Sequence, residues 1–145
     1  MGVDQGVGVM AWSPLSYGLL SGKFRRDAPP PAESRQCLAE TLFGIDWERL
    51  YRIVDVLITL AAGRGATPAQ VALNWVRGKP GVDTVIIGAR NEQQLRDNLG
   101  AADWELSTEE VSRLDEASAT PEPYPFGFQQ KLASERNPRL PSRRD

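Results

Sequence analysis

Histidine is absent from this chain of 145 residues, and cysteine occurs once, at Cys37. Without histidine, Ser-His-Asp and Cys-His nucleophilic centres and the common His-containing zinc sites are excluded. A single cysteine cannot make an internal disulfide. Because Cys37 has no imidazole to activate it, we expect an exposed or packed thiol rather than a nucleophile.

Long apolar runs and a strong charge imbalance are also missing. The longest largely apolar stretch, 53–62, is interrupted by Asp55 and Thr59 and is far shorter than the ~20 residues of a membrane span. The formal net charge is only −2, with both signs mixed along the chain. The sequence therefore predicts neither a membrane nor a nucleic-acid partner. Its start lacks the pattern of a signal peptide, so we expect a soluble protein of the reducing cytoplasm.

The remaining composition is that of an ordinary globular domain, which we place at 1–119. After this domain the sequence turns to prolines, aromatics and charges, so 120–145 is predicted to be an extended, partly disordered tail. The segment 25–36 is charged and contains the three prolines 29–31. We expect it to be a long, mobile surface loop.

Two short apolar runs with β-branched residues predict buried strands. The first, 6–12, is bounded by turn signals and ends before Pro14, and the second is 82–87. Between them, the glycine-containing segment 18–22 suits a short helical turn whose backbone can approach a ligand closely.

Two amphipathic helices are predicted between the strands. The first opens at 45–48, and we expect Gly63 to end it. The second has Thr67 as its N-cap and Pro68 at its first position, and it ends at 78–80. Their predicted core faces are Leu50, Ile53, Val54, Leu57, Ile58 and Ala61, then Val71, Ala72, Trp75 and Val76.

Two further helices are predicted after the second strand. Asn91 should cap the first of them, with Leu95 and Leu99 facing inward. Ser107 and Glu110 have the spacing of a capping box at the start of the last helix. The inward residues of this last helix are predicted to be Val111, Leu114 and Ala117.

The predicted order is therefore strand, helix pair, strand, helix and final helix. Two parallel strands alone do not make a stable sheet-based domain, because each strand needs hydrogen-bonded neighbours and both faces need cover. We therefore interpret the chain as a piece of a larger fold. The order matches the last two β/α units of a (β/α)8 barrel.

Four motifs recur in register and order, and through them the chain resembles the aldo-keto reductases over nearly all of 6–118. The similarity is greatest to the branch that includes the potassium-channel β subunits and bacterial oxidoreductases. The resemblance implies an α/β fold: an incomplete (β/α)8 TIM barrel with the last two β/α units, a C-terminal helix and the tail. The motifs are Trp12-Ser13-Pro14-Leu15, Ser21-Gly22-Lys23, Thr67-Pro68-Ala69-Gln70-Val71-Ala72-Leu73 and Ile87-Gly88-Ala89-Arg90.

The resemblance also implies that NADP(H) binds where both strands run out into loops. At the end of the first strand, the ring of Trp12 can lie against a flat nicotinamide. Ser13, Leu15 and Ser16, on either side of Pro14, can offer backbone and hydroxyl donors to a pyrophosphate. The alternative for Trp12 is a core aromatic on a buried strand.

Two cations are candidates for phosphate contacts. Lys23 could reach a phosphate as a point charge, although composition alone favours a solvated surface lysine. Gly88 and the start of the helix capped by Asn91 can present backbone N–H groups to an anion. Arg90 adds a planar cation suited to a ribose phosphate, which favours NADP(H) over NAD(H).

Polar residues on the helix after the second strand complete the candidate site. Gln94, Asp97 and Asn98 fall on one helix face and would point toward the adenosine if the resemblance holds; otherwise they form a solvated face. For Trp75 we prefer a structural role, because its spacing is that of a core aromatic packed on the sheet.

We assign no catalytic residue. The tyrosine, lysine, aspartate and histidine that the family uses come from the first half of its barrel, and Tyr17, Tyr51 and Tyr124 match none of its catalytic motifs. The isolated chain is therefore predicted to be inactive. Hydride transfer between NADPH and an aldehyde or ketone would need a complete barrel.

Three interpretations stay open. The first, which we favour, is a C-terminal portion of an NADP(H)-dependent carbonyl reductase. The second is a non-catalytic nucleotide-binding or interaction module. The third is a half-barrel that assembles with itself or with a separate N-terminal half.

Overall fold

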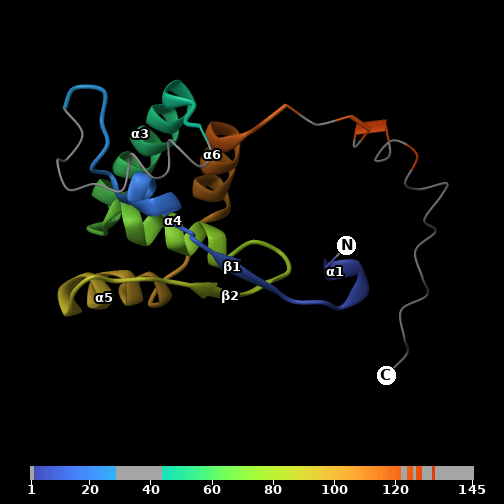
Figure 1. Cartoon of the computed structure of the whole chain (residues 1–145), viewed down its shortest axis with the longest axis horizontal. Coiled ribbons are helices and arrows are strands. Elements are labelled where there is room, and N and C mark those ends of the chain that lie inside the picture. Colours follow the sequence, from blue (N-terminus) through green and yellow to red (C-terminus); the bar gives the residue numbers. More distant parts are fainter. Residues whose placement is uncertain (1, 29–43, 122–123, 126, 129–131, 133–145) are drawn as a thin grey trace.

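The fold is α/β, and the predicted strands and longer helices occur in the predicted order after a short N-terminal helix that was not predicted. The computed structural model describes residues 2–28, 44–121, 124–125, 127–128 and 132 (Figure 1). Its elements are α1 (Gly2–Gln5), β1 (Val9–Trp12), the 3-10 helix η1 (Ser16–Ser21), α3 (Trp47–Arg64), α4 (Pro68–Arg77), β2 (Val82–Ile86), α5 (Glu92–Leu99), the 3-10 helix η2 (Gly100–Ala102) and α6 (Thr108–Ser118).

The two predicted strands are confirmed, and they pair with each other in parallel. Met10 lies opposite Thr84 and Trp12 opposite Ile86, so both strands end at the same level. Within the described ranges the sheet has these two strands only.

Helices cover one side of this sheet. In Figure 1 α4 lies next to the strands, and α3 and α6 pack beyond it. The core forms among these helices, where Val54, Leu57 and Val71 are almost completely buried. The core faces predicted for α3, α4 and α6 are therefore confirmed, because the buried apolar clusters form from side chains of these three helices.

Helix caps follow the local sequence. The side chain of Asp46 accepts a hydrogen bond from Arg49 N at the start of α3, and Asn91 accepts one from Gln94 N at the start of α5. Complete capping boxes open α4, at Thr67, and α6, at Ser107.

The predicted end of α3 is wrong by two residues. Gly63 lies inside the helix, which continues to Arg64, and Gly65 forms the cap at φ 64°. A glycine inside a helix costs only about 1 kcal/mol relative to alanine, so Gly63 does not stop it. Gly65 does, because it turns the chain into the left-handed region.

The prediction of buried strands and of an inward leucine pair on α5 is also wrong. Met10 and Trp12 are 69% and 70% exposed, and Leu95 and Leu99 are 42% and 55% exposed. The reason is the one-sided helix layer, since nothing in the described part of the chain covers the opposite side of the sheet.

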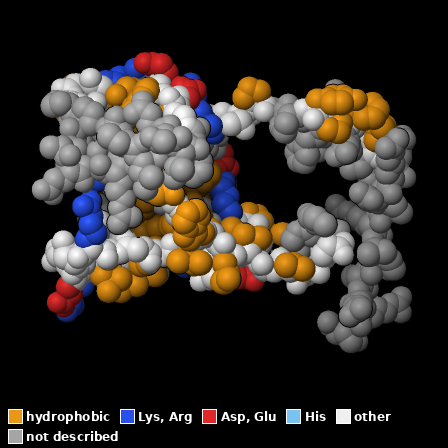
Figure 2. Space-filling model, viewed as in Figure 1, with side chains coloured by type: hydrophobic (Ala, Val, Ile, Leu, Met, Phe, Trp, Pro, Cys, Tyr) orange, Lys and Arg blue, Asp and Glu red, His pale blue; other side chains and the backbone are white. Residues whose placement is uncertain are grey.

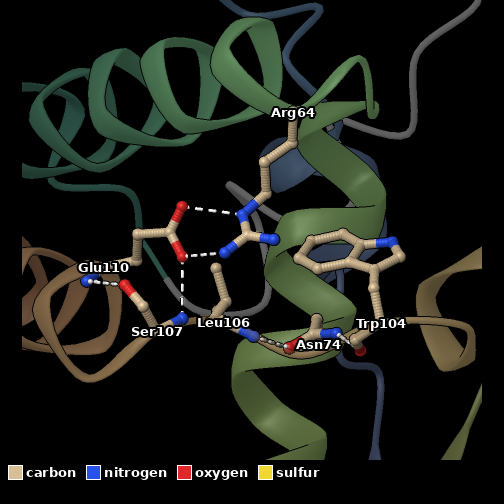
Figure 3. Close-up of polar contacts among 6 residues, drawn as sticks. All are labelled: Arg64, Asn74, Trp104, Leu106, Ser107 and Glu110. Atoms are coloured by element: carbon tan, nitrogen blue, oxygen red, sulfur yellow. Dashed lines mark hydrogen bonds and ion pairs between the residues drawn. The ribbon is translucent and has the colours of Figure 1, made fainter.

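Asn74 joins α4 to the segment before α6 (Figure 3). Its side chain is 3% exposed; Nδ2 donates to the carbonyls of Ala101 and Trp104, and Oδ1 accepts from Leu106 N at 3.1 Å. One buried amide therefore satisfies three backbone groups of a segment about 30 residues away in the chain.

An ion pair between the end of α3 and the start of α6 lies beside this amide. Arg64 donates to both carboxylate oxygens of Glu110, and its guanidinium carbon is 5.1 Å from the centroid of the Trp104 ring (Figure 3). The hydrogen bond from Arg64, helped by those from Ser107, lowers the pKa of Glu110 to about 2 against the opposing effect of desolvation.

Two predicted segments lie largely outside the described residues. These are the loop 25–36, with neighbouring Cys37, and the tail 120–145. Among the helices that are described, none has both the length and the apolar character needed to cross a membrane.

Candidate functional site

Parallel pairing brings the two predicted site segments together. Because Trp12 lies opposite Ile86, the turn that begins at Ser13 and the loop that begins at residue 87 leave the sheet side by side. Both leave from the carboxyl edge, which is where parallel α/β proteins bind ligands. The sequence prediction of one shared edge is confirmed.

The turn after β1 has an unusual backbone. Ser13, Ser16 and Tyr17 adopt φ values of 56°, 48° and 58°, although none of them is glycine. Such left-handed conformations cost on the order of 1 kcal/mol or more each and are concentrated at functional sites. Hydrogen bonds from Ser16 N to Ser13 O and from Gly18 N to Leu15 O, both 2.9 Å, hold the turn.

This backbone feature was not predicted from the sequence. Glycine at 18 signalled a tight turn, and Gly18 does adopt φ 88°, but nothing in the residue types marks the two serines and the tyrosine as left-handed. The observation adds Tyr17 to the residues that shape the candidate site.

Trp12 projects away from the core. Its side chain is 70% exposed, so the alternative of a core aromatic does not describe its surroundings in this structure. Met10 follows the same side of the strand, because alternate residues of a strand share a face. An exposed indole at the carboxyl edge is available to stack on a planar ring.

Lys23 lies against the turn rather than extending into solvent. Its ammonium is 5.5 Å from the centroid of the Phe24 ring, and a Cβ on Gly18 would come within 3.1 Å of it. Glycine at 18 therefore allows the lysine to fold over the turn, next to the residues predicted to face a pyrophosphate.

Hydrogen bonds from α5 fix the loop after β2. Gln94 Oε1 accepts from Arg90 N at 2.8 Å, and Asn98 Nδ2 donates to Gly88 O at 3.4 Å. Asn98 is 4% exposed, whereas Arg90 is fully on the surface. These bonds hold the loop backbone, whereas the side chain of Arg90 is exposed and forms no hydrogen bond or ion pair with another described residue.

Asp97 has a different set of contacts. Its Oδ2 accepts from Thr67 Oγ1 at 3.1 Å, and its carbonyl accepts from Gln70 Nε2 at 2.7 Å. Asp97 thus ties α5 to the capping box of α4. The predicted polar face is neither uniformly solvated nor uniformly directed at a ligand, because Gln94, Asp97 and Asn98 all make contacts within the protein.

A hollow of about 270 Å³ opens beside the turn, between η1 and the start of α3. It is smaller than a typical ligand pocket of about 300–1,000 Å³. The hollow is lined by Ser16, Leu19, Leu20, Gly44, Ile45, Asp46, Arg49, Leu50 and Ile53.

Tyr51 and Tyr124 have different surroundings in the described part of the chain. Tyr51 packs on Trp47, with ring centroids 5.8 Å apart, and the guanidinium of Arg26 lies 5.1 Å from its ring. Tyr124 is 92% exposed on a turn near the C-terminal end of the described residues. These are structural or solvent-facing positions.

Parallel strands and a helix layer on one side define an α/β protein. The strained turn at the carboxyl edge of its strands forms part of the candidate site. Comparison with known proteins gives the family. Residues 1–119 match the sequence model of the Aldo/keto reductase family, and the chain belongs to this family.

Curated relatives include bacterial proteins and a plant protein. An uncharacterised oxidoreductase of Mycobacterium tuberculosis is 40% identical over 122 residues, which is 82% of this chain and 36% of the relative. A probable voltage-gated potassium channel subunit beta of Arabidopsis thaliana is 35% identical over 69% of the chain, and the protein Tas of Escherichia coli is 32% identical over 77%. The chain thus spans about a third of the length of the relatives it matches.

Proposed function

We propose that this chain is the NADP(H)-binding, C-terminal portion of an aldo-keto reductase. In the complete (β/α)8 barrel, NADPH would supply a hydride to an aldehyde or ketone. The observation that carries the proposal is the register of β1 and β2, which brings the turn after Trp12 and the loop around Arg90 to one edge. The oxidoreductase relatives support the reaction class.

The residues present fit a dinucleotide. The turn from Ser13 to Ser16 holds a fixed backbone beside Lys23, which suits a pyrophosphate. The guanidinium of Arg90 is exposed on a loop that Gln94 and Asn98 hold in place. A planar cation so placed suits the dianionic 2'-phosphate that distinguishes NADPH from NADH.

The proposal assigns no proton donor to the described residues. We therefore expect the carbonyl substrate to bind only in a complete barrel, and we expect residues 1–119 to form the barrel portion with 120–145 as its tail. A soluble, cytoplasmic reductase is the corresponding proposal for the whole protein. A non-catalytic nucleotide-binding module is the second candidate, favoured by the similarity to the channel subunit beta of Arabidopsis thaliana.

Titration of the chain with NADPH and NADH tests the proposal, with the change in total tryptophan fluorescence that Trp12→Phe removes as the signal of binding at Trp12. Arg90→Ala should weaken NADPH binding by about 1.5–3 kcal/mol, as expected for a charge-assisted hydrogen bond, and leave NADH nearly unchanged. Arg96→Ala is the matched control, because Arg96 is an exposed arginine of the neighbouring helix paired with Glu92.

Equal losses for both nucleotides would make Arg90 a structural residue of the loop. Absence of any NADPH binding by the chain would contradict the proposed cofactor site. To separate the two candidate functions, the same loop would be placed in a full-length barrel, where NADPH consumption with an aldehyde distinguishes a reductase from a binding module.

A further inference from the structure

The start of α4 lies between the two segments that form the candidate cofactor site. Helix α4 contacts η1, which follows β1, and it also contacts α5, which follows β2. Three residues at this start, Thr67, Pro68 and Gln70, make contacts to the two sides, and we call them the α4 brace. None of them belongs to the strand ends or to the loops predicted to touch the nucleotide.

On the side of η1, the contact is a close approach of Pro68 to Gly22. A Cβ on Gly22 would lie 2.6 Å from Pro68 Cγ and 2.9 Å from Pro68 Cβ, so a larger residue there would have to displace the ring or the turn. Gly22 immediately precedes Lys23, the cation predicted to reach a phosphate. Van der Waals contact therefore sets the position of this turn relative to α4.

On the side of α5, the contacts are hydrogen bonds to Asp97. Thr67 Oγ1 donates to Asp97 Oδ2 at 3.1 Å, and Gln70 Nε2 donates to Asp97 O at 2.7 Å. The next residue, Asn98, donates through Nδ2 to Gly88 O in the loop after β2. The brace is thus connected to that loop through the last turn of α5.

Helix α4 is anchored in the core behind the brace. Val71, Ala72 and Leu73 are at most 3% exposed. Hydrophobic side chains gather around the middle of the molecule in Figure 2, where α4 lies in Figure 1. A close-packed helix transmits a displacement at one contact instead of absorbing it. The capping box also holds Thr67 and Gln70, the two side chains that bind Asp97.

We propose that the α4 brace sets the separation between the two halves of the candidate site, the turn after β1 and the loop after β2. Its members are positioning residues, because they act through Gly22 and Asp97. The inference rests on the proposed function. A dinucleotide must engage both segments at once, and its affinity falls when their separation does not match the ligand. A ligand that reaches one segment alone does not depend on that separation.

Two variants of the full chain each break one side of the brace. Pro68→Ala removes the ring atoms that pack on the turn and leaves Thr67 as the N-cap. Gln70→Glu keeps the acceptor for Thr67 N, because a capping box accepts glutamate or glutamine, but it cannot donate to Asp97 O. Glu110→Gln is the matched control, since it makes the reverse exchange at the same position of the capping box of α6.

Titration compares NADPH with adenosine 2'-monophosphate, which carries the 2'-phosphate but has no pyrophosphate. Both brace variants should weaken NADPH binding about 3–30-fold, the effect expected of mutations within a coupled network, and should leave binding of the monophosphate unchanged. The control should change neither affinity. Equal losses for the two ligands, or a brace variant that binds NADPH as well as wild type, would overturn the inference.

Amide exchange without nucleotide judges the brace separately from the cofactor site. Pro68→Ala should speed exchange in α5, and Gln70→Glu should speed it in η1, each on the side opposite to the broken contact. The control should speed exchange in neither element. A response confined to the altered side would overturn the inference even if NADPH binds. If wild type binds no NADPH, the proposed cofactor site fails, and the exchange result still decides whether α4 couples the two segments.

Discussion

Replacement of Asn74 by alanine should lower the free energy of unfolding of the chain by about 2–6 kcal/mol. The side chain is buried and bonds to Ala101 O, Trp104 O and Leu106 N. Trp104 O keeps a second donor, Arg77, so two groups are orphaned: Ala101 O and Leu106 N. An unsatisfied buried backbone group costs about 1–3 kcal/mol, which gives the total for two.

Urea denaturation of wild type and Asn74→Ala measures this loss as a change in midpoint at constant slope. Amide exchange of Leu106 provides a local measurement that does not require complete unfolding. Asn91→Ala is the comparison, because loss of an exposed N-cap should cost only about 1 kcal/mol. A loss below about 1 kcal/mol for Asn74→Ala would refute the reasoning, since it would mean that water or a shift of the 101–106 segment satisfies both orphaned groups.

Three further outcomes are expected. Because Arg64 holds the pKa of Glu110 at about 2, below its ordinary 4.5, the stability from this pair is present above pH 4.5 and is lost as pH falls toward 2. Glu110→Gln should remove about 1 kcal/mol of this pH dependence of the unfolding free energy. If the variant loses stability with acid in the same way as wild type, the role of the pair is contradicted. Thr67→Ala should lower the free energy of unfolding by about 1–2 kcal/mol and release the Asp97 side chain. Amide exchange should then become faster in both α4 and α5. A response confined to α4 would show that the Thr67–Asp97 hydrogen bond does not couple the two helices. The isolated chain should reduce no aldehyde at a measurable rate, because it has no assigned proton donor and general acid catalysis typically raises a rate by ~10²–10⁴-fold. Consumption of NADPH with an aldehyde that survives repurification of the chain would contradict this expectation.

Local signals predicted the helices well. Thr67 with Gln70 and Ser107 with Glu110 form the capping boxes that their spacing predicts, because each box needs only residues within one turn. Local signals failed where two similar residues compete. Gly63 and Gly65 are both glycines near the end of α3, so residue type alone does not distinguish them. Gly65 adopts the left-handed backbone that ends the helix, whereas Gly63 keeps the helical conformation.

Contacts between distant residues were beyond sequence patterns. Spacing placed Asp97 on a polar helix face, but it could not show that Thr67, 30 residues earlier, donates to it. The role of Asn74 was likewise not predicted, since a single asparagine in an apolar helix carries no local sign of which backbone groups it will satisfy. The candidate site was predicted at its edge of the sheet, while the left-handed backbone at Ser13, Ser16 and Tyr17 was not.

The wrong predictions of burial have a common physical origin. Periodicity identifies which residues need an apolar partner, but it does not say whether that partner lies in the same chain. Leu95, Leu99 and Met10 all fit an inward pattern, and all three are exposed where the helix layer ends. A position that the pattern marks as buried but the fold leaves exposed therefore lacks an apolar cover among the described residues. In this chain the exposed positions lie on and beside the same two strands whose carboxyl ends carry the candidate cofactor site.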